Sequence, residues 1–291
     1  MNKPSHFHIG YGRSGSTWIQ REIFKKNNKN INFIRSREWL IKRAKKSSDL
    51  KNAYPNFKSN SVVLESEEGL IGDEFRDHYE LAKKIYWINP KAKILICIRS
   101  QYSIIKSFYY LYIKKGGIDS FEEYLETIIN NKKFNYWKIY KTYVKKFGKK
   151  NIKIVFFEDL INEPNCFVTQ INSWLGVKTI DFKFDISRNK NQSYDYIYIE
   201  VLRILNIFLG ISKLPRGNND KVSNEFRKKI KLRKLLFSFL SIIIKPIKFF
   251  KLSKKLEFNN KFLKKIKKFY HANNNLIFQE LCEKKNRKYY P

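Results

Sequence analysis

The sequence predicts an α/β fold in three layers, with a central, mainly parallel β-sheet between two layers of helices. Short apolar runs, typical of buried parallel strands, alternate along the chain with segments of helical periodicity. Strands that alternate with helices favour right-handed β-α-β crossovers and a doubly wound sheet. The expected strands are 7–10, 61–64, 93–98 and 152–157, and the expected helices are 16–26, 79–87, 103–113 and 121–147.

The composition supports a large core. Of the 291 residues, 43% are hydrophobic and 16% are aromatic. We expect a single domain over 1–291, with an α/β core in 1–200 and a basic, mainly helical part of the same domain in 201–291. A basic and apolar stretch at 226–270, broken by Pro246, predicts two or three amphipathic helices. These helices either cover one face of the sheet or lie in a membrane interface.

The formal net charge of +34 is concentrated toward the end of the sequence. From Lys221 to Pro291 there are 21 Lys and Arg residues against 4 Asp and Glu residues, a balance of +17. Such a surface favours an anionic partner, which could be a multiply charged nucleotide, an acidic polymer or a membrane face. We expect no specific nucleic-acid partner, because no helix-turn-helix, zinc finger or RNA-binding motif is recognisable.

The cysteine and histidine patterns predict neither disulfides nor a metal site. Cys97, Cys166 and Cys282 are scattered, which predicts buried free thiols in a reducing compartment. The four histidines lack metal-ligand spacing. The first residues lead into a strand without an apolar signal region, and the apolar run 235–244 is too short to span a bilayer. We expect a cytoplasmic protein and leave open a peripheral contact with the inner face of the membrane.

The segment 8–18 reads HIGYGRSGSTW and is close to a phosphate-binding loop. Gly10, Gly15 and Thr17 fall where G-x-x-x-x-G-K-[ST] requires them. Ser16, however, replaces the lysine that reaches the β- and γ-phosphates of a nucleoside triphosphate. The loop is therefore expected to bind an anion whose reacting group is not a γ-phosphate.

A cation is still present in this loop, at Arg13. The backbone amides of 12–17 can converge on one anion, and the following helix points the positive end of its dipole at the same place. The alternative is an ordinary strand-to-helix turn with Arg13 in solvent.

A second candidate site follows the strand 93–98. Arg99 stands at the end of this strand, where an isolated arginine is costly unless it is paired with an anion. Ser107 lies eight residues further on, about two turns into the next expected helix. An arginine on the strand end and a hydroxyl on the helix can close on one phosphate.

Together, these two motifs resemble those of the sulfotransferases that use 3′-phosphoadenosine-5′-phosphosulfate, and they are most similar to bacterial members. The family's 5′-phosphosulfate loop, [RK]-S-G-[ST]-T-W, is matched by 13–18, and its 3′-phosphate motif by Arg99 and Ser107. The resemblance implies a P-loop NTPase-like sulfotransferase fold with a helical C-terminal elaboration. Weaker matches are 155–160 with Pro164, and Phe269, Tyr270, Asn274 and Leu276 with 289–291.

The resemblance also implies roles for individual residues. The donor's 5′-phosphosulfate would lie in the loop and its 3′-phosphate at Arg99 and Ser107, leaving adenosine 3′,5′-bisphosphate as the product. Arg13 would be catalytic, by neutralising charge on the transferring sulfuryl group and on the leaving oxygen. Trp18 would either stack on adenine or belong to the core. The implied donor-binding residues are Gly12, Arg13, Ser14, Gly15, Ser16, Thr17, Trp18, Arg99 and Ser107.

An in-line transfer also needs a general base for the acceptor. The segment 62–72 follows an expected strand and resembles a bacterial S-x-E-x-L segment on the acceptor side. Glu68 is the first candidate and Glu67 the second; the alternative is an acidic loop that faces solvent. Glu158 and Asp159 are expected to cap or orient neighbouring backbone. The basic segment 188–193 either approaches the 3′-phosphate or is a simple loop.

The expected function is transfer of a sulfuryl group to a hydroxyl or amine. The bacterial resemblance implies that the acceptor is a carbohydrate, a lipid-linked saccharide or another cell-envelope metabolite. One alternative is a P-loop nucleotide kinase, against which Ser16 in place of lysine argues. The other is a non-enzymatic basic protein that binds nucleic acid or an anionic membrane surface.

Overall fold

The computed structural model describes residues 3–27, 29–35, 41, 44–50, 54, 61–71, 78–178, 196–211, 224–249 and 260–291. The chain forms two compact units. The first comprises Met1–Gln101, Phe134–Asn189 and Lys267–Pro291, and the second comprises Tyr102–Lys133 and Lys190–Ile266. The basic C-terminal part is thus divided between the two units, and the single domain over 1–291 stays a prediction.

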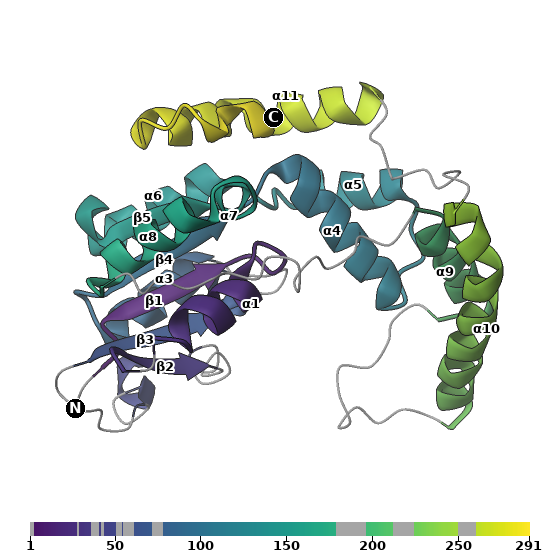
Figure 1. Cartoon of the computed structure of the whole chain (residues 1–291), viewed down its shortest axis with the longest axis horizontal. Helices are drawn as coiled ribbons and strands as arrows, with labels where there is room; N and C mark the ends of the chain where they lie inside the picture. Colours follow the sequence, from purple (N-terminus) through teal and green to yellow (C-terminus); the bar gives the residue numbers. More distant parts are fainter. Residues whose placement is uncertain are drawn as a thin grey trace. The chain divides into compact units, whose positions relative to one another are not determined.

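The first unit is built on a parallel sheet of five strands in the order β2-β3-β1-β4-β5 (Figure 1). Every neighbouring pair in this sheet is parallel, which confirms the predicted sheet and α/β class. The strands are β1 His6–Gly10, β2 Ile31–Arg35, β3 Val62–Glu67, β4 Lys93–Ile98 and β5 Ile152–Phe156.

Helices lie on both faces of this sheet (Figure 1). On one face are α1 Ser16–Trp18, which continues as the π-helix η1 Ile19–Phe24, and α8 Pro164–Leu175, which follows α7 Phe157–Asn162. Their apolar side chains form one buried cluster with strand residues that include Leu64, Leu95 and Val155. On the other face α3 His78–Ile88 packs against α6 Tyr136–Phe147. Because helices cover both faces of the sheet, strands β4 and β5 bury side chains on both sides. This explains their nearly continuous apolar sequences.

Four of the five strands coincide closely with the predicted ones, whereas β2 was not predicted. It is a five-residue strand at the edge of the sheet, paired among the described strands with β3 alone, and its INFIR sequence mixes polar and apolar residues. A strand of this length carries little periodicity.

The prediction of one helix over 121–147 is wrong. The structure has α5 Phe121–Asn130 and α6, with a turn between them. Lys132 and Phe134 have φ angles of 49° and 57°, in the left-handed region that a helix cannot contain. Asn135 then starts α6 by accepting a hydrogen bond from the amide of Lys138 at 3.0 Å.

The second unit contains most of α4 Gln101–Lys114, together with α5, α9 Tyr196–Phe208 and α10 Asn224–Phe249. The prediction of a helix break at Pro246 is wrong, because α10 runs on to Phe249. Pro246 removes one backbone hydrogen bond, but the helix continues for three residues beyond it. The predicted helices of the basic stretch are confirmed as α10 and α11 Asn260–Glu280.

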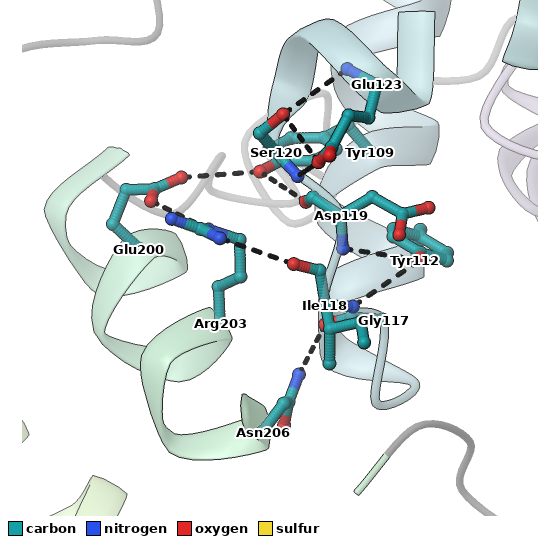
Figure 2. A network of polar contacts seen from close by, with 10 residues as sticks. All are labelled: Tyr109, Tyr112, Gly117, Ile118, Asp119, Ser120, Glu123, Glu200, Arg203 and Asn206. Carbon is teal, nitrogen blue, oxygen red and sulfur yellow. Dashed lines mark hydrogen bonds and ion pairs between the residues drawn. The ribbon is translucent and has the colours of Figure 1, made fainter. Parts of the chain in front are cut away.

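Polar contacts fasten α9 to the turn between α4 and α5 (Figure 2). The Asn206 amide donates to the carbonyls of Ile113 at 2.9 Å and Gly117 at 2.8 Å. Arg203 donates to the carbonyl of Ile118 at 3.2 Å. A side chain at Gly117 would displace the ring of Tyr112, because its Cβ would lie 2.3 Å from that ring. These contacts make α9 part of the second unit.

Short 3₁₀ helices complete the described elements, at η2 Ser47–Leu50, η3 Glu68–Ile71, η4 Lys149–Asn151 and η6 Asn286–Tyr289. Of the helices in the ranges given above, none is both long and apolar enough to cross a bilayer. All three cysteines are free; Cys97 is buried as predicted, but Cys166 and Cys282 are exposed, so the predicted burial is wrong for these two.

Two buried histidines of β1 predict a loss of stability in mild acid. Burial lowers the pKa of His8 to about 3 and that of His6 to about 4, against 6.5 for a free side chain. Below pH 6.5 these histidines become protonated in the unfolded chain but stay neutral in the folded chain. The free energy of unfolding therefore falls as the pH drops from 6.5 toward 4. Each histidine contributes a slope of up to about 1.4 kcal/mol per pH unit.

The variant His8→Phe should show a shallower slope in urea unfolding across this pH range. Its neighbour Ser66 keeps a partner, because Gln20 Nε2 donates to Ser66 Oγ at 3.0 Å. An unchanged slope in this variant would contradict the burial of a neutral His8.

Candidate functional site

The carboxyl ends of three adjacent strands meet at one edge of the sheet. The register pairs Ile9 of β1 with Glu67 of β3, and Gly10 of β1 with Cys97 of β4. The loop 11–15, the glutamates that follow β3 and the segment from Arg99 therefore leave the sheet at the same edge. Ligands of open parallel sheets bind at this edge.

The loop after β1 has the backbone of an anion-binding turn. Arg13 and Gly15 have φ angles of 70° and 86°, both left-handed. A Cβ on Gly15 would lie 3.0 Å from Leu160 Cδ2 and 3.1 Å from Phe157 Cδ2, so glycine is required there by space as well as by φ. Left-handed residues in a short turn direct successive amides toward one side.

The helix that follows this loop begins with unsatisfied amides. Its first backbone hydrogen bond runs from Ile19 N to Gly15 O at 3.0 Å, and no side chain caps the helix at Gly15. Within the part of the chain that the structure describes, the amides of 14–17 donate to no backbone carbonyl. Unsatisfied amides at a helix start are an anion-binding arrangement.

The hydroxyl groups of the loop differ in their surroundings. The Ser14 and Ser16 hydroxyls are buried, and neither has a hydrogen-bond partner among the described residues. Thr17 is exposed. Buried hydroxyls are normally hydrogen-bonded, so unpaired ones beside free amides fit a ligand rich in acceptor oxygens.

Two consecutive carbonyls tie the loop to the end of β4. The Cys97 thiol donates to the carbonyl of Ser14 at 2.9 Å, and Arg99 Nη1 donates to the carbonyl of Arg13 at 2.7 Å. The structure thus brings the two predicted motifs into direct contact through Arg99 and Arg13.

The guanidinium of Arg99 is held in a largely buried position. Its carbon lies 4.3 Å from the ring centroid of Phe157, a cation–π contact. Burial lowers the pKa of Arg99, while the negative charge of Glu158 opposes this shift. Arg99 nevertheless stays charged, because the pKa of a free guanidinium lies far above neutrality.

Glu158 is the central acceptor of this region. Its carboxylate accepts hydrogen bonds from the amide of Ser100 and from the hydroxyl of Tyr290, both at 2.9 Å. Burial raises the pKa of Glu158, and these two hydrogen bonds act in the opposite direction. The prediction that Glu158 orients neighbouring backbone is confirmed by its bond to Ser100.

Sequence reasoning missed an aromatic cluster that is bonded to the backbone of Arg99. The hydroxyl of Tyr136 donates to the carbonyl of Arg99, and the Tyr11 ring lies 4.8 Å from the ring of Phe134 and 6.1 Å from that of Tyr136. Burial raises the pKa of Tyr11 to about 12, so this tyrosine stays protonated at neutral pH. Tyr11 stands inside the loop motif and could have been noticed; nothing in the sequence near Tyr136 signals its role.

The candidate bases follow β3. Glu67 is the last residue of the strand and Glu68 the first residue of η3, and both are half-buried. The amide of Glu68 donates to a carboxylate oxygen of Glu67 at 3.2 Å. Glu65, in contrast, is fully buried within the strand and accepts a hydrogen bond from the hydroxyl of Tyr54.

Three other predicted residues have different placements. Trp18 is buried in the core cluster, 6.5 Å from the ring of Phe167, which is the alternative that the sequence left open. Ser107 is half-buried on α4 and belongs to the second unit. The segment 188–193 lies outside the described residues. Among the residues described, no group of three or more His, Cys, Asp or Glu side chains is placed to hold a metal ion.

An anion-binding turn after the central strand of a parallel sheet defines a P-loop-like protein. A family model described as a sulfotransferase domain matches residues 3–231, and the chain belongs to this sulfotransferase-domain family. No curated protein matches the chain.

One solved structure supports this fold with a TM-score above 0.5, and two others are more distantly similar. A sulfotransferase from Alicyclobacillus acidocaldarius has a TM-score of 0.51 and 16% identity, over 73% of this chain and 97% of that chain. A mouse sulfotransferase complexed with PAP has a TM-score of 0.42 and 14% identity, over 62% of each chain. A retinol dehydratase in a complex with retinol and PAP has a TM-score of 0.40 and 13% identity, over 81% of this chain and 82% of that chain.

The hydrogen bonds around Glu158 predict that replacing Glu158 lowers the free energy of unfolding more than replacing its partner Tyr290. Glu158→Ala removes the carboxylate to which the Ser100 amide and the Tyr290 hydroxyl donate, and with it a negative charge beside Arg99, so the free energy of unfolding should fall by about 3 kcal/mol or more. Tyr290→Phe removes one hydrogen bond and should cost about 1 kcal/mol. Urea unfolding measures both.

Glu163→Ala is the matched control, because this exposed carboxylate pairs only across the surface with Lys285, at 2.6 Å. Its removal should cost less than about 1 kcal/mol. Equal losses in Glu158→Ala and Glu163→Ala would show that Glu158 does not support the site.

Proposed function

We propose that this protein transfers a sulfuryl group from 3′-phosphoadenosine-5′-phosphosulfate to a hydroxyl or amine of an acceptor. The observation that carries the proposal is the loop after β1. Its carbonyls at Arg13 and Ser14 are tied to Arg99 and Cys97, and the amides of 14–17 that follow donate to no backbone carbonyl among the described residues. Membership of the sulfotransferase-domain family supports the reaction class.

The loop residues fit the 5′ end of this donor. The amides of 14–17 offer hydrogen-bond donors to the oxygens of a phosphosulfate. So do the hydroxyls of Ser14 and Ser16, which have no partner among the described residues. Gly12 and Gly15 keep the backbone accessible, and Thr17 adds an exposed hydroxyl. Trp18 would support this loop from the core, where its ring lies.

Arg99 and Ser107 form the proposed 3′-phosphate site. Arg99 supplies the charge, and Ser107 the hydroxyl from α4. Since these two residues belong to different compact units, their closure on one phosphate is part of the proposal.

Different residues of the chain would stabilise charge and accept the proton during transfer. The donor, when bound, supplies an activated sulfuryl group. Arg13 and the helix-start amides stabilise the charge that develops on the transferring group and on the departing phosphate oxygen. Glu68, or otherwise Glu67, accepts the proton that the acceptor hydroxyl loses.

The proposed acceptor is a carbohydrate, a lipid-linked saccharide or another cell-envelope metabolite. The bacterial resemblance of the motifs supports this class, and so does the +34 charge of the chain, which suits an anionic glycan or headgroup. We place the enzyme in the cytoplasm, in contact with the inner face of the membrane.

Ligand binding tests the donor. Adenosine 3′,5′-bisphosphate should raise the melting temperature without magnesium, and a ligand at 100 times its Kd adds about 2.7 kcal/mol of stability. ATP with magnesium should give a smaller shift, because the loop has Ser16 in place of lysine. The absence of any shift with the bisphosphate would refute the proposal, and a larger shift with ATP and magnesium would favour a kinase.

Arginine variants separate transfer from donor binding. Arg13→Ala should abolish transfer, whereas Arg99→Ala should mainly weaken binding of the bisphosphate, by about tenfold or more. Arg21→Ala is the control, because Arg21 follows the loop on η1 and pairs at the surface with Glu22 at 2.6 Å. Equal effects of all three substitutions would point to general charge rather than to a site.

Once a labelled-donor screen of glycans and lipids has identified an acceptor, the base can be tested. Glu68→Gln should lower kcat by about 100-fold or more and leave the affinity for the bisphosphate unchanged. Glu67→Gln should have a smaller effect. If neither substitution lowers kcat, the base lies elsewhere.

A further inference from the structure

Helix α10 carries a stripe of exposed apolar side chains. Leu232, Leu235, Phe239 and Ile242 follow one another at spacings of three, four and three residues, which places them on one face. Their exposed fractions are 44%, 69%, 63% and 63%. Single exposed apolar residues are common, but a row of four large ones marks a contact surface.

The opposite side of α10 is fixed by contacts inside the second unit. Arg233 donates to the carbonyls of Ile113 at 3.3 Å and Lys114 at 3.0 Å. The Phe237 ring lies 6.2 Å from the ring of Tyr198 on α9. Since these contacts set the rotation of the helix, the apolar stripe faces away from α9.

Cations accompany the stripe. Lys228 and Lys231 are four residues before Leu232 and Leu235, so they continue the same face by one turn. Arg227 and Lys234 are exposed beside them. Among the described side chains of α10, Glu225 is the only acidic one, and it pairs with Lys229 at 3.3 Å.

We propose that this face of α10, consisting of the apolar stripe and the four cations Arg227, Lys228, Lys231 and Lys234, binds an anionic membrane surface. The helix would lie in the plane of the interface, with Leu, Phe and Ile in the acyl boundary and the lysine and arginine heads at the phosphates. This surface lies outside the proposed catalytic residues, so the proposal does not depend on the sulfuryl donor.

The charge pattern of this face favours an anionic membrane over a second copy of the chain and over a nucleic acid. A second copy of α10 packed on the stripe would bring like charges together, which opposes association. A nucleic acid would satisfy the cations but would leave the apolar stripe in water. An anionic lipid surface offers negative charge beside an apolar phase, so it meets both parts of this face.

Flotation of the full chain with lipid vesicles tests the proposal. The protein should bind vesicles of phosphatidylcholine mixed with phosphatidylglycerol, and should bind phosphatidylcholine alone about tenfold or more weakly, with binding that falls as salt rises. The double substitution Leu235→Ser and Phe239→Ser keeps the charge and should weaken binding by about tenfold or more. Ile161→Ser, which changes an isoleucine on α7 that is 53% exposed, should bind as wild type.

The melting temperature and the sedimentation of the same samples test whether the variants fold and whether the chain self-associates. Both variants should keep the wild-type melting temperature, because the replaced side chains are exposed. Wild-type binding by the double variant, or equal binding to charged and neutral vesicles, would overturn the proposal. It would also be overturned if sedimentation showed a wild-type dimer that the double variant loses while vesicle binding is unchanged.

Discussion

The hydrogen bond from the guanidinium of Arg99 to the carbonyl of Arg13 is the constraint on which the candidate site depends. It joins the end of β4 to the loop after β1, and the Cys97 thiol adds a second tie one residue further along that loop. Two carbonyls of the loop are bonded to β4 and to Arg99 after it, and the amides of 14–17 at the start of the following helix have no backbone acceptor in the part of the chain that is described. The left-handed conformations of Arg13 and Gly15 make this turn possible within a few residues.

A charge in this position has to be supported by the rest of the first unit. Burial lowers the pKa of Arg99, and the Phe157 ring and the Glu158 carboxylate replace part of the water that the guanidinium has lost. Tyr290 in turn donates to Glu158. Tyr290, next to the last residue of the sequence, thus supports a site whose loop lies in the first twenty residues. Asn274 of α11 strengthens this link through its paired amide bonds with Gln101, at 2.9 and 3.1 Å.

Much of this architecture could be predicted because it depends on local patterns. Buried parallel strands are short apolar runs, and a phosphate-type loop needs glycine at fixed spacing, so β1, β4 and the loop were found from their residues alone. Family membership confirmed the resemblance on which the donor-site prediction rests.

What could not be predicted depends on contacts between distant segments. The amphipathic edge strand β2 has too few residues to show a period. The turn between α5 and α6 requires left-handed Lys132 and Phe134, residue types that do not signal such a conformation. The supports of Arg99 are tyrosines 37 and about 190 residues away, and no local pattern identifies them.

Calorimetric binding of adenosine 5′-monophosphate to wild type and Arg99→Ala tests the central claim most directly, because this nucleotide has a 5′-phosphate but lacks the 3′-phosphate. If Arg99 shapes the loop as well as meeting the 3′-phosphate, the substitution will weaken binding of the monophosphate by about tenfold, the cost of about one charge-assisted hydrogen bond. An unchanged affinity for the monophosphate, with loss confined to the 3′,5′-bisphosphate, would show that the tie between Arg99 and the loop is not needed for binding at the 5′ end.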